Sequence, residues 1–173
     1  MINILTFSEF INDINENLNN SDIKLELDGF EDKDKNLING IVNNFFQSIS
    51  SEYYNEFLNI SKSSFDRHKK EIIESIQTML NIFKDYLDFR IVHIPNEKDK
   101  KEDVIKAPLY FRWSEFNNQT LIVEIYVTND PYVEKLFKYY FTSRRLKFSD
   151  NCSNNLVKYG GEYNITIEYD FFD

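Results

Sequence analysis

Residues 63–89, SSFDRHKKEIIESIQTMLNIFKDYLDF, carry the pattern that decides the fold. Their apolar side chains recur at three- and four-residue steps, which predicts a long amphipathic helix. Ser63, with Asp66 three residues later, is predicted to cap the first turn of this helix. Because a helix of this length needs a sheet or other helices to cover its apolar face, we expect the flanking sequence to complete one core.

The sequence before this helix predicts more helices and one short strand. Apolar spacing indicates helices over residues 6–18 and 37–49, and the same spacing continues over residues 53–60. Residues 23–28 alternate apolar and polar side chains, which predicts a half-buried strand. The N-terminal half of the chain, residues 1–89, is therefore expected to be mainly helical.

The sequence after the long helix predicts strands. Residues 91–94 form a short apolar run, and the highly charged residues 96–103 that follow it are expected to form an exposed loop. Residues 109–114 and 121–128 alternate apolar and polar side chains on either side of a short polar connection. This arrangement predicts an antiparallel hairpin.

A short helix and a second hairpin complete the C-terminal half. Asp130 followed by Pro131 predicts a helix start. Gly160 and Gly161 separate two further runs, and glycine adopts the positive φ angles of a tight hairpin turn. Together these patterns predict an α+β fold in one domain, residues 1–173, with a mostly antiparallel sheet of about five to seven strands packed against the long central helix.

The amino-acid composition indicates which cellular compartment and which class of protein to expect. The chain has 173 residues, of which 42% are hydrophobic, enough for one substantial core. A single cysteine, Cys152, excludes an internal disulfide and favours a reducing compartment. No stretch approaches the roughly 18 apolar residues of a membrane span, and the N-terminus lacks a secretory pattern. We expect a cytoplasmic protein of bacterial or phage origin that does not contact membranes.

The net charge of −9 is unevenly distributed. Residues 1–60 hold 11 acidic side chains and three lysines, a net charge of −8, so the other 113 residues are nearly neutral. An acidic region of this kind repels nucleic acid and speeds encounters with basic surfaces. The alternative is an ordinary acidic surface that keeps a small protein soluble.

The candidates for catalysis are few. His68, three residues before Glu71, is expected to be a surface histidine beside its own ion-pair partner. His93 is expected to be a hydrogen-bonded histidine within a strand. Cys152 is expected to be an unreactive free cysteine in a polar loop. No spacing of Cys, His, Asp or Glu predicts a metal site, and no phosphate-binding or dinucleotide motif predicts a cofactor.

A second feature combines bases with aromatic side chains. It consists of Lys138, Tyr139, Tyr140, Arg144, Arg145 and Lys147. Single-stranded nucleic acid binders use this combination. The alternatives are a helix end whose bases complement the helix dipole while its aromatics pack on the sheet, or a patch neutralised by the acidic N-terminal region.

The preferred hypothesis is a non-enzymatic protein that inhibits a basic protein partner stoichiometrically, as a toxin-neutralising immunity protein or a phage-type antagonist of a nuclease complex does. The predicted contact residues are Glu26, Asp28, Glu31, Asp32, Asp34, Glu52 and Glu56. The alternative hypothesis is a nucleic-acid-binding or processing protein that uses residues 135–148. An enzyme is the third hypothesis, and it requires His68, His93 or Cys152 to meet a second polar group in a concave pocket.

Overall fold

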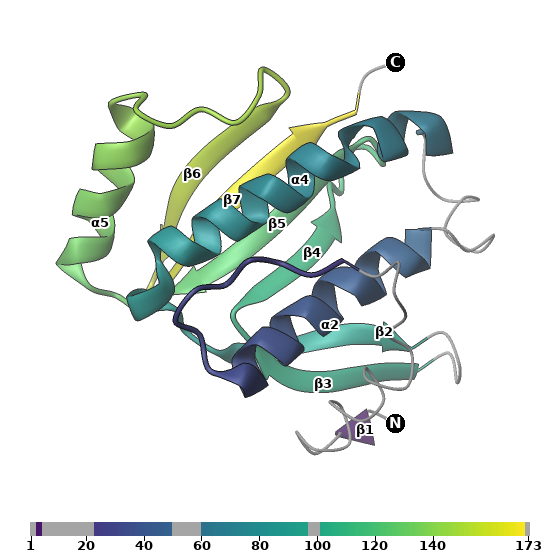
Figure 1. The fold of residues 1–173 in the computed structure, drawn as a ribbon, viewed down its shortest axis with the longest axis horizontal. Helices are drawn as coiled ribbons and strands as arrows, with labels where there is room; N and C mark the ends of the chain where they lie inside the picture. Colours follow the sequence, from purple (N-terminus) through teal and green to yellow (C-terminus); the bar gives the residue numbers. More distant parts are fainter. Residues whose placement is uncertain (1–2, 5–22, 50–59, 97–100, 172–173) are drawn as a thin grey trace.

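The computed structural model describes residues 3–4, 23–49, 60–96 and 101–171, and it has the predicted α+β fold (Figure 1). The helical elements are α2 (Asp32–Ile49), α4 (Lys62–Ile82), a 3-10 turn (Lys84–Tyr86), α5 (Pro131–Phe137) and a π-helical turn (Lys138–Thr142). The strands are β1 (Asn3–Ile4), β2 (Arg90–Asn96), β3 (Lys101–Ala107), β4 (Leu109–Trp113), β5 (Thr120–Val127), β6 (Cys152–Tyr159) and β7 (Glu162–Asp170).

The long central helix is α4, and it is shorter than the sequence predicts. The side chain of Ser61, not that of Ser63, caps it by accepting a hydrogen bond from the Ser64 amide at 3.1 Å. The helix ends at Ile82, because the chain turns into a 3-10 turn after Phe83. Most of its apolar face is buried against the sheet: Ile72, Ile76, Met79, Leu80 and the C-cap Phe83 have no exposed surface, whereas Ile73 and Ile82 are partly buried.

The strands form two sheets, not the one sheet that the sequence predicts. The larger sheet is antiparallel with strand order β4-β5-β7-β6, and α4 lies across it (Figure 1). The smaller sheet has the order β1-β3-β2, with β1 parallel to β3, and α2 lies in front of it. Pro108 lies between β3 and β4, and a proline has no amide to continue a ladder. The chain therefore leaves one sheet there and enters the other.

The two predicted hairpins are confirmed, and a third, between β2 and β3, was not predicted. This third hairpin extends to the Asn96–Lys101 pair, so part of the predicted charged loop belongs to strands. The β4–β5 hairpin is present, and β6 and β7 meet at a turn where Gly160 has φ 61°. The side chain of Asp130 caps α5 by accepting from the Tyr132 amide at 2.8 Å.

Residues 23–28 are not a strand of either sheet. Their burial alternates as predicted, with Leu25 and Leu27 buried, but the segment crosses between α2 and α4 and joins no ladder (Figure 1). Side-chain amides on the two helices take the place of a neighbouring strand. The predicted helix at residues 6–18 and the helical spacing at 53–59 lie outside the described residues. No helix in the described part of the chain is long and apolar enough to cross a membrane.

Candidate functional site

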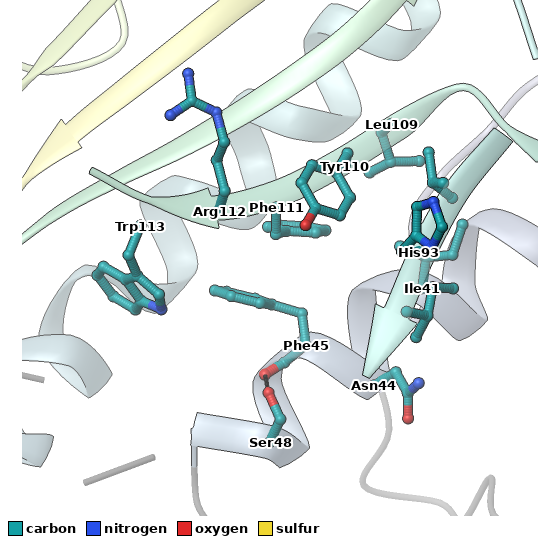
Figure 2. A pocket seen from close by; sticks show the side chains of 12 residues that line it. Ile41, Asn44, Phe45, Ser48, His93, Leu109, Tyr110, Phe111, Arg112 and Trp113 are labelled. Carbon is teal, nitrogen blue, oxygen red and sulfur yellow. Dashed lines mark hydrogen bonds between the residues drawn. The ribbon is translucent and has the colours of Figure 1, made fainter. Parts of the chain in front are cut away.

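A pocket of about 270 Å³ lies where the two sheets separate (Figure 2). Helix α2, strand β2 and strand β4 form its walls. It is lined by Ile41, Asn44, Phe45, Ser48, Val92, His93, Ile94, Leu109, Tyr110, Phe111, Arg112 and Trp113. Successive side chains of a strand point to opposite faces, yet all five residues of β4 line the pocket. The pocket therefore adjoins the edge of β4 instead of one face of the sheet.

The floor of the pocket is aromatic. The rings of Phe45 and Phe111 are stacked, with centroids 4.2 Å apart and planes 10° apart, and they face each other between α2 and β4 (Figure 2). The Trp113 ring lies 6.3 Å from that of Phe45. The sequence assigns these residues to the core by periodicity, but Phe45, Phe111 and Trp113 are only partly buried. The site is therefore suited to apolar or aromatic groups.

Two ion pairs lie at the polar margin of the pocket. His93 Nδ1 is 3.4 Å from Glu102 Oε2, and Arg112 Nε is 3.5 Å from Glu124 Oε1. Burial, together with the charges of both carboxylates, raises the pKa of Tyr110 above its ordinary value. The Tyr110 hydroxyl therefore keeps its proton at neutral pH. His93 thus lies within a strand, as the sequence predicts, and its ring is directed to Glu102 beside the pocket.

His68 and Cys152 lie away from this pocket. His68 Nδ1 is 3.8 Å from Glu71 Oε2, as the sequence predicts, but its side chain is only 15% exposed and its ring packs edge-on against Phe171. Cys152 is a free cysteine at the start of β6, not in a loop. Burial raises the pKa of its thiol to about 12, which disfavours the nucleophilic thiolate. No group of three or more metal-ligating side chains occurs in the described residues.

The predicted acidic contact residues lie partly on one segment. Glu26, Asp28, Glu31 and Asp32 are exposed, whereas Asp34 is partly buried. Desolvation raises the pKa of Asp34, and the charge of Glu31 raises it further. Glu52 and Glu56 lie outside the described residues.

Four side-chain amides hold the backbone of this acidic segment, and we call them the amide clamp: Asn39, Asn43, Gln77 and Asn81. On α2, the Oδ1 atoms of Asn39 and Asn43 accept from the Leu25 and Ile23 amides at 2.7 and 2.8 Å, and Asn43 Nδ2 donates to the Ile23 carbonyl at 2.7 Å. On α4, Gln77 Oε1 accepts from the Glu26 amide at 2.7 Å, and Asn81 Nδ2 donates to the Glu26 carbonyl at 2.8 Å.

The amide clamp escaped the sequence analysis, although a signal for it exists. Each helix carries its two amides four residues apart, so both amides lie on one helical face. In α2 the pair occurs within the apolar face, where a buried polar side chain requires hydrogen-bond partners. In α4 the pair borders the apolar face, and the Gln77 side chain contacts the crossing segment.

The basic-aromatic residues lie on the π-helical turn that follows α5 and on the loop between that turn and β6 (Figure 1). The Arg145 guanidinium lies 4.4 Å from the centroid of the Tyr139 ring, which is 51% exposed. Tyr139 and Tyr140 meet edge to face at 4.9 Å. Lys147 pairs with Asp150 at 2.7 Å. Arg144 adopts φ 56°, an uncommon conformation for a residue with a side chain.

The acidic and basic regions do not neutralise each other within the described residues. No ion pair there joins residues 26–34 to residues 135–148. The alternative of an internal partner for the basic patch stays a prediction, because six of the 11 acidic side chains in residues 1–60 lie outside the described residues. Lys33 instead pairs locally with Glu31 at 3.4 Å.

No family model, curated protein or solved structure matches the chain.

Proposed function

We propose that the protein binds a basic protein partner through residues 24–34 and thereby inhibits it stoichiometrically. The observation that carries this proposal is the amide clamp, which ties the start of an exposed acidic segment, at Ile23, Leu25 and Glu26, to both helices. An inhibitor needs a contact segment that is ordered before it meets its target, because ordering on binding reduces affinity. The clamp meets this requirement without using any exposed side chain of the segment.

The charge of the segment supports a basic partner. Residues 24–34 carry five carboxylates and two lysines, and the side chains of Glu26 and Asp28 project from the clamped backbone into solvent. Exposed carboxylates accelerate association with a basic surface and make the rate dependent on salt. A nuclease or a nucleic-acid-binding toxin presents such a surface. An immunity protein or an antagonist of a nuclease complex is therefore the class that we propose.

The test compares two charge-matched double variants. Glu26→Lys with Asp28→Lys changes the proposed contact segment. Glu74→Lys with Glu115→Lys changes exposed carboxylates elsewhere, and each pair moves the net charge from −9 to −5. Tagged wild type and both variants are used to capture proteins from nuclease-treated lysate of the native or host cell. We expect wild type and the control pair to retain one basic protein stoichiometrically, and the contact pair to lose it.

Binding measurements with the purified proteins then distinguish a specific contact from an effect of net charge. The contact pair should slow association with the captured protein at least about tenfold and flatten its salt dependence, while the control pair changes both far less. The captured protein's activity should fall to zero at one equivalent of wild type. Equal retention by wild type and the contact pair would remove residues 24–34 from the interface.

The alternative is nucleic acid binding through the basic-aromatic surface. One observation favours it. Lys135, Lys138, Arg144 and Arg145 are exposed, with no ion pair to a carboxylate among the described residues, and Arg145 covers an exposed tyrosine ring. Binding of a labelled single-stranded oligonucleotide at two salt concentrations tests it. Arg144→Ala with Arg145→Ala should weaken binding and reduce the salt slope by about two, while Lys101→Ala with Lys106→Ala should not.

A further inference from the structure

The edge of β4 that borders the pocket carries unpaired backbone groups. The Tyr126 amide donates to the Pro108 carbonyl at 2.8 Å, and the Ser114 amide donates to the Thr120 carbonyl at 2.9 Å. Hydrogen-bonded pairs alternate along an antiparallel ladder. Residues 110 and 112 therefore bond to β5, whereas the amides and carbonyls of Leu109, Phe111 and Trp113 point to the other side.

No strand of the described residues lies on that other side. β4 is an edge strand of its sheet, and β2, which faces it across the pocket, is an edge strand of the other sheet. No hydrogen bond in the described residues involves the outward backbone groups of Phe111 and Trp113. An open edge of this kind is a template for a further strand. The pocket therefore offers donors and acceptors in the spacing of an extended peptide.

The charges around the pocket select a neutral occupant. Arg112, the one arginine that lines the pocket, is already paired with Glu124, and the His93 ring lies 3.4 Å from Glu102. The floor between them is formed by the stacked rings of Phe45 and Phe111. An uncharged backbone with apolar side chains complements this surface. A phosphate or another anion would lack a free counter-charge and would leave the strand edge unpaired.

We propose that this pocket binds an extended, uncharged peptide segment of a partner protein, which adds to β4 as a strand and places an apolar side chain on the aromatic floor. Main-chain hydrogen bonds to β4 provide the affinity, and the floor selects the side chain, as in other cases of strand addition. The inference rests on the pocket alone and does not depend on the acidic segment or on the proposed function.

The experiment uses Trp113, the single tryptophan of the chain, as the reporter. Random decapeptides displayed on phage are selected on the full-length protein, and the most enriched peptide is synthesised with both ends capped. We expect an alternating apolar sequence without proline in its centre. Binding should shift the Trp113 emission to shorter wavelength, because the peptide removes water from the pocket. The Glu26→Lys, Asp28→Lys variant should bind this peptide as wild type does.

Backbone methylation decides whether the peptide adds as a strand. Two peptides each carry two N-methyl groups, at alternate residues in one of the two possible phases. The phase that faces β4 should weaken binding at least about tenfold, because two main-chain donors are lost. The other phase should leave binding within about twofold. The absence of any enriched peptide, or equal effects of both phases, would overturn the proposal. A Trp113 shift with protein concentration alone would assign the edge to a second copy and would also overturn it.

Discussion

Helices α4 and α2 have similar amphipathic patterns, but they meet different surfaces. Helix α4 lies across the four-stranded sheet, and the side chains that face the sheet, such as Met79 and the C-cap Phe83, have no exposed surface. Helix α2 lies where two sheets separate, and Phe45 on its surface stays partly exposed above an open pocket. The comparison teaches that an apolar face determines which side of a helix turns inward. The surface beneath the helix determines whether that side is sealed.

The largest effect is expected from a substitution in the buried interface between α4 and the larger sheet. Phe83→Ala should lower the free energy of unfolding by about 3–5 kcal/mol, because it leaves a cavity under α4 that neighbouring residues cannot fill. Urea denaturation followed by circular dichroism measures the change. A loss below about 1 kcal/mol would show that the α4 interface can collapse around the cavity and is not closely packed.

The next effect concerns the contact between α2 and the crossing segment. Asn43→Ala should cost about 2 kcal/mol, because the amide and carbonyl of Ile23 lose their partner. Asn44→Ala is the matched control, since Asn44 is exposed on the same helix, and it should change the stability by less than about 0.5 kcal/mol. Urea denaturation measures the free energy of unfolding of both variants. Equal stabilities would mean that Asn43 does not support the segment.

A smaller effect is expected at the open interface. Phe45→Ala should cost about 1–2 kcal/mol, less than Phe83→Ala, because Phe45 is partly exposed and loses mainly its stacking on Phe111. The same substitution should move the emission of Trp113 to longer wavelength, because water then reaches that ring. A loss equal to that of Phe83→Ala would show that α2 is sealed as tightly as α4, and the comparison would fail.

The smallest effect lies outside both interfaces. The hydrogen bond from Lys158 on β6 lowers the pKa of Glu134 on α5 below its ordinary value of 4.5. This carboxylate therefore stabilises the fold above pH 4.5, and the contribution is lost as the pH falls through the lowered pKa. Thermal melts should show wild type more stable than Glu134→Gln at neutral pH, with the difference vanishing in acid. A difference that persists in acid would mean that the pair acts by packing instead of charge.

Several elements could be predicted from local patterns because their causes are local. The three-to-four spacing predicted α4 and α2, the alternation at residues 109–128 predicted the β4–β5 hairpin, and Gly160 marked the turn between β6 and β7. The exact cap of α4 was wrong by two residues because Ser61 and Ser63 both satisfy the local rule. The hydrogen bond that the Ser61 side chain accepts from the Ser64 amide identifies Ser61 as the cap.

The candidate site was less predictable. The basic-aromatic residues were identified from composition, and five of the seven acidic residues lie on one described segment. The pocket was not predicted, because Phe45, Phe111 and Trp113 show the same periodicity as core residues. His93 and Glu102 lie on different strands of a hairpin whose register brings them together. Their proximity depends on the register of the β2–β3 hairpin, which local sequence patterns do not determine.

The sequence by itself determined the class of fold, the direction in which each helix and strand turns its apolar side chains, and the uneven distribution of charge. These follow from side-chain spacing and composition, which act over a few residues. Only the tertiary structure decided that the strands divide into two sheets at Pro108, that Asn39, Asn43, Gln77 and Asn81 bind a crossing segment, and that a pocket remains beside β4. These features depend on contacts between residues far apart in the chain, and no local pattern encodes the distances between them.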